Sequence, residues 1–294
     1  MTALGYLIEA ISLGVLYALI AVSVGLVFGV LRQVNLAQGE VIAFGAYSLW
    51  MLSGLPAALQ IVLCFAICIA SSLVLQLVVF RPLRGASPLT TLIVTFGVSY
   101  GLEALWQIIY GPNGNPVTVL SMLNTTAIGG AIALRWITLV EIGAGAVLFS
   151  GLYLILFRSG LGVKMRAAAE DVATARLVGV RVQRVVTWAF VLSGVSAAVV
   201  AVLSTVQTPL ITPNFGLTLL IVALVGVVLG GIDNLGRATA GGFIIGFVNS
   251  LLGSVLPEQS LVFLPSLTFL FVIIALLARP NGLLMPRRAG VERV

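Results

Sequence analysis

The chain has 294 residues, of which 60% are hydrophobic and only 8% are charged, and its mean hydropathy is +1.20. A soluble domain carries about 25% charged residues, so this composition excludes an ordinary water-soluble fold and indicates an integral membrane protein. The net charge is +6. In a membrane protein such a basic excess more often reflects orientation in the bilayer than nucleic-acid binding, so we expect a lipid bilayer and no nucleic acid as partner.

Apolar segments separated by charged or turn-forming residues predict an all-α fold that crosses the bilayer with eight or nine segments. The first segment follows Glu9 rather than a positive residue and is too long for the core of a signal peptide, so we expect it to be retained. The second and seventh are short, and glycines surround the end of the seventh, which predicts some short or broken helices. The segments are 9–31, 38–54, 57–80, 88–110, 136–157, 185–206, 216–232, 238–256 and 260–278.

The cations predict how the chain is oriented. If the N-terminus is outside, every lysine and arginine except Arg135 faces the cytoplasm, an asymmetry that the positive-inside rule favours. We therefore expect an N-out, C-in topology. In this topology the loop 111–135 is external and the loop 158–184 is cytoplasmic.

The loop 158–184 contains eight charged residues between two strongly apolar segments. Apolar side chains at helical spacing across 163–178 predict one short helix that ends at Gly179. Arg166 and Glu170 lie four residues apart and can support each other on its polar side. The helix is suited either to dock in a cleft of another protein or to lie on lipid headgroups, and periodicity does not choose between them. Its weakly apolar face consists of Met165, Ala168, Ala169, Val172 and Ala175.

The residue types present exclude several kinds of enzyme. The chain has no histidine, so it contains neither a Ser/His/Asp triad nor a histidine-ligated metal. Its single lysine, Lys164, does not lie in a G-x-x-x-x-G-K-[ST] loop, so ATP hydrolysis by that route is excluded. Cys64 and Cys68 are expected to be small packing residues. We expect a protein that is not an enzyme and that needs no cofactor or metal.

Three carboxylates inside predicted segments bear on an alternative function, that of an ion-coupled carrier. Glu40 is expected near a cytoplasmic end and Glu141 near an external end, where hydration is easy. Glu103 is the deepest, and it either faces a solute pathway or pairs with Arg135 or another helix. One deep carboxylate is thin support for ion coupling. A membrane scaffold without transport is a further alternative.

Several sequence blocks occur in an order and spacing that are specific together. They are 14–21, 25–31, 34–40 with 45–47, 81–85, 92–97, 166–171 with Gly179, 229–232 with Gly236, Gly241 and Gly242, and 279–283. Together they resemble the LivH-type permease subunits of bacterial ABC importers for branched-chain amino acids. Gln38 stands where that family often has histidine, so a role that needs the imidazole does not carry over.

The resemblance implies one permease domain over 1–294 in the bacterial inner membrane, working by alternating access. It implies a second, LivM-like permease subunit, two ATP-binding subunits and a periplasmic substrate-binding protein as partners. The loop 158–184 would couple the permease to the ATPase, as a rigid lever over 164–178. Arg166, Glu170 and Asp171 would hold it in the ATPase cleft, and Gly179 would let the chain turn back. The same blocks permit urea or short-chain amides as solute, and they indicate no substrate contacts.

Overall fold

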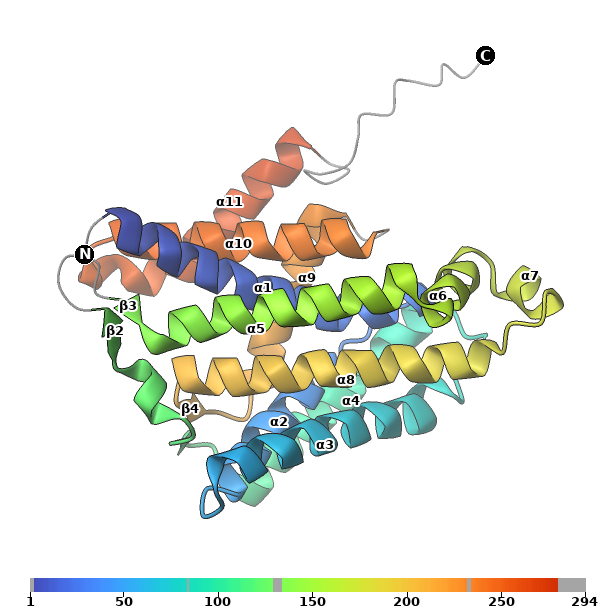
Figure 1. Cartoon of the computed structure of the whole chain (residues 1–294), viewed down its shortest axis with the longest axis horizontal. Coiled ribbons are helices and arrows are strands. Elements are labelled where there is room, and N and C mark those ends of the chain that lie inside the picture. Colours follow the sequence, from blue (N-terminus) through green and yellow to red (C-terminus); the bar gives the residue numbers. More distant parts are fainter. Residues whose placement is uncertain (1–2, 84, 129–133, 232–233, 280–294) are drawn as a thin grey trace.

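Figure 1 shows the computed structural model of the chain, which describes residues 3–83, 85–128, 134–231 and 234–279. The elements are α1 (Ala3–Leu31), α2 (Gln38–Met51), α3 (Ala57–Leu75), η1 (Gln76–Phe80), α4 (Pro88–Tyr110), β1 (Asn115–Pro116), η2 (Ser121–Asn124), β2 (Thr126–Ile128), β3 (Leu134–Arg135), α5 (Trp136–Tyr153), η3 (Leu154–Arg158), α6 (Gly160–Glu170), α7 (Val172–Leu177), α8 (Val182–Gln207), β4 (Leu210–Ile211), α9 (Phe215–Gly230), α10 (Leu235–Val255), η4 (Glu258–Phe263) and α11 (Leu264–Ala278). Several predicted features lie outside the described residues: Arg84, part of the loop 111–135, Ile232, the motif after Arg279, and Arg287, Arg288 and Arg293.

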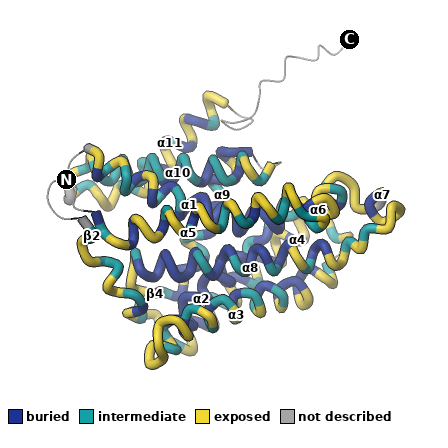
Figure 2. The backbone as a smooth tube through the Cα atoms, viewed as in Figure 1, coloured by how far each residue is buried: buried dark blue, intermediate teal, exposed yellow. Residues whose placement is uncertain are grey.

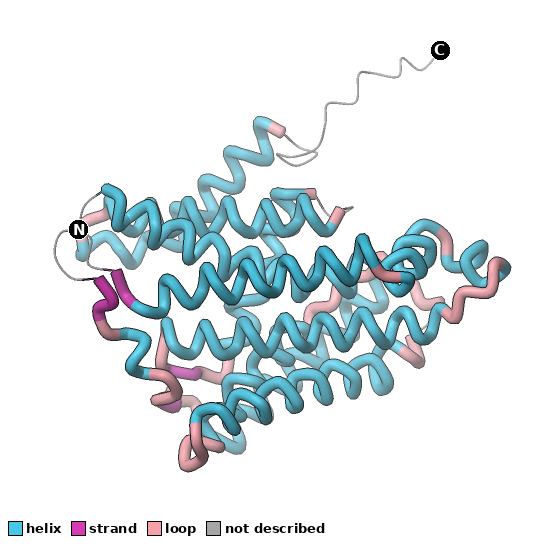
Figure 3. Tube along the Cα trace, in the orientation of Figure 1, coloured by secondary structure: helices cyan, strands magenta, loops and turns pink. Residues whose placement is uncertain are grey.

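Helix dominates the described residues, which confirms the predicted all-α membrane architecture (Figure 3). Seven helical segments in the described part are long and apolar enough to cross a bilayer: Leu4–Leu31, Ala57–Phe80, Pro88–Tyr110, Trp136–Arg158, Val182–Gln207, Leu235–Val255 and Gln259–Ala278. The two segments predicted to be short form α2 and α9, with 14 and 16 residues. At 1.5 Å per residue they extend roughly 21 and 24 Å, less than the roughly 30 Å hydrocarbon core of a bilayer.

The helix bundle has two different ends. At the end near the N-terminus, β1 pairs with β4 and β2 pairs with β3, both antiparallel. At the opposite end, α6 and α7 project beyond the long helices (Figure 1). The predicted external loop 111–135 and the predicted cytoplasmic loop 158–184 therefore lie at opposite ends of the bundle.

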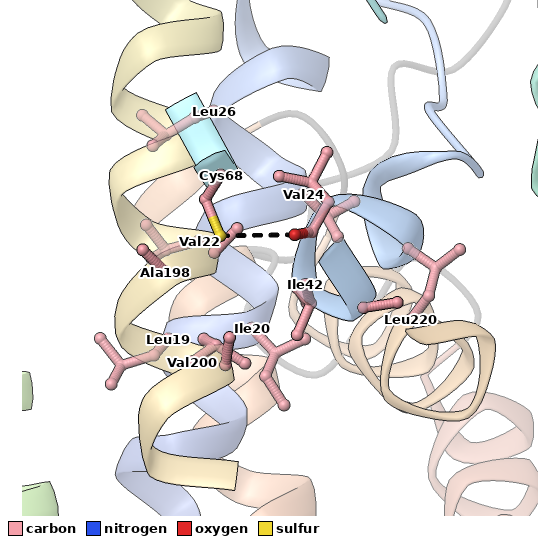
Figure 4. Packing of buried hydrophobic residues seen from close by; sticks show 14 of the residues in the cluster. Leu19, Ile20, Val22, Val24, Leu26, Ile42, Cys68, Ala198, Val200 and Leu220 are labelled. Carbon is pink, nitrogen blue, oxygen red and sulfur yellow. Dashed lines mark hydrogen bonds between the residues drawn. The ribbon is translucent and has the colours of Figure 1, made fainter. Parts of the chain in front are cut away.

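The core lies around α1 and α8, whose side chains are mostly buried, whereas few side chains of α4, α5 and α11 are buried (Figure 2). In Figure 4, apolar side chains from α1, α2, α8 and α9 point toward one another. The thiol of Cys68 is buried among them and donates to the carbonyl of Val41, 3.5 Å away. Cys64 is also buried and donates to the Gly45 carbonyl at 3.6 Å. The prediction that both cysteines are packing residues is confirmed.

Glycines allow the close approach of helices around α10. A Cβ atom added to Gly226 of α9 would lie 2.7 Å from the Cα of Gly242 on α10. One added to Gly246 would lie 2.8 Å from the Cα of Gly14 on α1. Such short contacts exclude any side chain, so these glycines bring the backbones of α1, α9 and α10 together, as small residues do in membrane proteins.

Candidate functional site

The loop 158–184 contains two helices, so the prediction of a single helix over 163–178 is wrong. α6 ends at Glu170 and α7 begins at Val172. Asp171 between them is extended, with φ −151° and ψ 114°. Its Oδ2 accepts a hydrogen bond from Thr174 Oγ1 at 2.5 Å, and its carbonyl accepts from the Ala175 N–H at 3.0 Å. Aspartate is among the best N-cap residues, and here it starts a new helix rather than continuing the old one.

Gly179 ends α7, as the sequence predicts. Its φ is +82°, in the left-handed region where glycine has no steric penalty. The Val180 N–H donates to the Ala175 carbonyl and the Gly179 N–H donates to the Arg176 carbonyl, each at 3.0 Å. This pair of bonds is a Schellman motif, which satisfies the last carbonyls of a helix and reverses the chain. The segment 160–180 is thus two short helical arms joined at Asp171.

The small apolar face of this segment packs within the chain itself. Met165, Ala168 and Ala175 are 3%, 1% and 3% exposed. Met165 and Ala168 belong to the same apolar cluster as α1 and α8, and Arg32 Nε donates to the Ala169 carbonyl at 3.2 Å. These three residues of the face are therefore unavailable to a partner, whereas Val172 is 39% exposed. Docking of the segment on another protein remains a prediction.

The two most exposed apolar side chains of the segment lie at the end of α7. Leu177 is 87% exposed and Val178 is 72% exposed. At 100° per residue, Leu177 points almost opposite to the buried Ala175. A leucine and a valine on a short arm that projects from the bundle form an apolar contact surface, which we name the α7 tip.

The expected mutual support of Arg166 and Glu170 is also absent. Arg166 Nη1 donates to the Leu156 carbonyl, and its guanidinium lies 5.3 Å from the centre of the Phe157 ring. Within the described ranges no ion pair joins Arg166 to Glu170. Arg166 instead fixes α6 to η3, and the carboxylates of Glu170 and Asp171 remain exposed at the joint between the two arms.

A cavity of about 510 Å³ lies between α1, the α5–η3 helix, α6 and the start of α10. Its walls are mostly apolar, and Arg32, Arg166 and Glu170 are among its few charged lining residues. Because Met165 and Ala169 of α6 form part of the wall, any displacement of α6 changes the shape of this cavity. No sequence pattern indicates this cavity, because its lining comes from four separate segments.

Glu40 is completely buried, contrary to the expected easy hydration. Ser99 Oγ donates to its Oε1 at 3.0 Å, and Trp106 Nε1 donates to its Oε2 at 3.1 Å. The Trp106 ring stacks on Tyr47, with centroids 4.5 Å apart. One carboxylate thus connects α2 to α4, and two hydrogen bonds and an aromatic stack offset part of the cost of burying it.

Glu141 is likewise fully buried, and the hydroxyl of Ser12 donates to its Oε2. The expectation that it is hydrated is wrong, because α1 covers it. Arg135 forms an ion pair with Glu9 at 3.1 Å rather than with Glu103. In the described part of the chain, Oε2 of Glu103 is buried without a hydrogen-bond partner.

Comparison with known proteins decides the family. Residues 6–278 match the family model described as "Branched-chain amino acid transport system / permease component". The chain belongs to this family. It is 31% identical to the high-affinity branched-chain amino acid transport system permease protein BraD of Pseudomonas aeruginosa, over 98% of this chain and 97% of that protein. It is 30% identical to the corresponding LivH proteins of Salmonella typhimurium and Escherichia coli, over 97% of this chain and 96% of each relative.

The structure brings together three of the four predicted site residues of this permease. Arg166, Glu170 and Asp171 lie at the end of α6, and Gly179 lies beyond α7, one short helix away. Sequence reasoning missed Arg32, whose Nε donates to the carbonyl of Ala169 in α6, 137 positions further along the chain. It also missed the α7 tip, although Leu177 and Val178 are adjacent apolar residues directly before Gly179, where the helix was predicted to end.

Proposed function

We propose that the chain is the membrane-spanning subunit of an ATP-driven importer that moves leucine, isoleucine and valine by alternating access. The observation that carries this proposal is the match to one permease family over residues 6–278. The relatives that match over nearly their whole length are named as high-affinity branched-chain amino acid permeases. Urea or short-chain amides are the alternative solutes.

The proposed assembly is the one that the family resemblance implies. This subunit pairs with a second, LivM-like permease subunit in the inner membrane. Two ATP-binding subunits attach on the cytoplasmic side, and a periplasmic binding protein delivers the solute. The proposed orientation is N-out and C-in, and what supports it is the distribution of charge. Among the described residues, the cations of the loop 158–184 lie at the end that carries α6 and α7, and Arg32 is bonded to α6, whereas Arg135 belongs to β3 at the other end.

We assign the contact with the ATP-binding subunits to the α7 tip, with Glu170 and Asp171 beside it. A fully buried leucine side chain contributes about 1.5–3 kcal/mol, whereas Leu177 is 87% exposed in this chain. Closure of the ATPase pair on ATP would displace α7. The short joint at Asp171 would pass that displacement to α6, which is fixed to α1 by the Arg32–Ala169 bond. The cavity beside α6 would then open or close.

The test is uptake by proteoliposomes that contain the permease pair, the ATP-binding subunits and the binding protein. Radiolabelled leucine should accumulate only with ATP inside and the binding protein outside. Glu170→Gln and Gly179→Val should reduce both uptake and stimulated ATP hydrolysis while leaving membrane insertion intact. Gly151→Val is the matched control for Gly179→Val, because Gly151 has open space around its Cβ position and no positive φ.

Three results would speak against the proposal. Uptake driven by a proton or sodium gradient without ATP-binding subunits would identify a carrier. Accumulation of urea but not leucine would reassign the solute. Normal coupling in both loop variants would remove the coupling role from this segment.

A further inference from the structure

A second cavity, of about 530 Å³, lies where η1 and the start of α8 meet the segment around α7. Its lining is unusually basic for a membrane protein with so few charges. Amide side chains surround the cations and supply further hydrogen-bond donors. The polar lining residues are Arg81, Arg176, Arg181, Gln33, Gln76 and Gln183.

The three arginines come from three separate parts of the chain. Arg81 follows η1, Arg176 belongs to α7, and Arg181 precedes α8. In the part of the chain that the structure describes, none of their guanidinium groups makes an ion pair or side-chain hydrogen bond. No acidic side chain is among the described residues that line the cavity.

Guanidinium groups remain charged at every physiological pH, so the cavity keeps a positive potential that only a bound anion neutralises. Their planar forks match the oxygens of a phosphate group, to which they donate two parallel hydrogen bonds. Three guanidinium groups around one cavity therefore favour a phosphate over a single carboxylate or chloride.

The surface beside the cavity is apolar. Val74, Leu77 and Val78 of the α3–η1 helix are 55%, 50% and 67% exposed, and this helix is long enough to span a bilayer. The basic cavity thus lies at the end of an exposed apolar surface on a helix long enough to span a bilayer. A phosphate attached to acyl chains contacts both surfaces at once, whereas a free phosphate contacts only one.

We propose that the cavity lined by Arg81, Arg176 and Arg181 binds the headgroup phosphate of an anionic phospholipid, whose acyl chains lie along α3 and η1. Basic pockets between transmembrane helices at the membrane surface bind anionic headgroups in this manner. The bound lipid connects α7 to the membrane helices, so it restrains the arm that carries the α7 tip. This site is independent of the proposed contact with the ATP-binding subunits.

Native mass spectrometry of the delipidated full chain in neutral detergent tests the site directly. Dioleoylphosphatidylglycerol and dioleoylphosphatidylcholine are titrated separately, and glycerol phosphate is titrated as a probe without acyl chains. The test variant combines Arg81→Gln, Arg176→Gln and Arg181→Gln. The matched control combines Arg158→Gln, Arg184→Gln and Arg237→Gln, which removes the same charge from cations that do not line the cavity.

Wild-type chain should bind phosphatidylglycerol in preference to phosphatidylcholine. Each arginine near an anionic headgroup increases the affinity about fivefold, so the test variant should bind phosphatidylglycerol roughly a hundredfold more weakly than wild type. The control variant should bind it nearly as tightly as wild type. Each variant is first checked for an unchanged elution volume and melting temperature. If the triple variant does not fold, a single Arg181→Gln variant replaces it, with an expected loss of about fivefold in affinity for phosphatidylglycerol.

Four outcomes would overturn the proposal. Equal losses in the test and control variants would show that only net charge matters. Absence of a preference for phosphatidylglycerol would exclude an anionic-lipid site. Binding of glycerol phosphate as tight as that of the lipid would identify a free-phosphate site. Unchanged lipid binding by the test variant, together with weaker binding of the ATP-binding subunits in a separate assay, would identify a protein contact. The lipid measurement uses the permease chain alone, so its result does not depend on the proposed ATPase coupling.

Discussion

Replacing Leu177 with alanine is the sharpest test of the α7 tip. The side chain is 87% exposed in this chain, so its truncation should leave the melting temperature of the isolated permease unchanged. If an ATP-binding subunit covers the leucine, truncation removes three carbon groups from an apolar contact, worth about 0.8 kcal/mol each. The total of about 2.4 kcal/mol corresponds to roughly fiftyfold weaker docking, since about 1.4 kcal/mol is a factor of ten.

The measurement is the affinity of the ATP-binding subunits for the permease in lipid nanodiscs, by biolayer interferometry. Leu89→Ala is the matched control, because Leu89 is 66% exposed at the start of α4 and outside the loop 158–184. An affinity of Leu177→Ala within about twofold of wild type would refute the reasoning, because so small a change corresponds to well under 1 kcal/mol. A lower melting temperature of the variant permease would also refute it, by showing that Leu177 packs inside the chain.

Three further predictions concern the stability of the fold. Trp106→Phe removes the indole donor from the buried Glu40 carboxylate and should lower the free energy of unfolding by about 1–3 kcal/mol, seen as a lower melting temperature. Trp188→Phe, at a half-exposed residue, should leave the melting temperature unchanged, and equal shifts in the two variants would contradict the prediction. Asp171→Ala removes the N-cap residue of α7 and should lower the stability of this helix by about 1 kcal/mol, seen as faster amide hydrogen exchange in α7. Unchanged exchange would argue against a capping role of Asp171. Gly246→Ala should lower the melting temperature because the added Cβ pushes α10 away from α1, whereas Gly97→Ala, with open space at its Cβ position, should leave it unchanged. An unchanged melting temperature of Gly246→Ala would mean that the two helices can separate without loss of stability.

Hydrophobic segments were enough to predict the helices of this protein, because a spanning helix needs about 20 consecutive apolar residues. The two segments that are too short for this were also recognised, and they are α2 and α9. The end of α7 at Gly179 followed from local chemistry alone. Features of this kind depend on neighbours in the chain and can be predicted from them.

Features that depend on distant neighbours were missed. The burial of Glu40 depends on Ser99 and Trp106, which lie 59 and 66 positions away. The break at Asp171 was missed because the apolar spacing continues across it, although the residue is a strong cap. The coupling role of Arg166, Glu170, Asp171 and Gly179 remains a prediction, because it concerns a partner outside this chain.

The burial of Met165 and Ala168 against the chain's own helices has a consequence for how the transporter is assembled. A loop that folds only on a partner loses conformational entropy when it binds, and its affinity falls accordingly. Here the ordering of α6 occurs during folding of the permease itself, so this helix is in place before any ATP-binding subunit docks. Assembly then joins subunits that are already folded, so subunits synthesised at different times can associate without refolding.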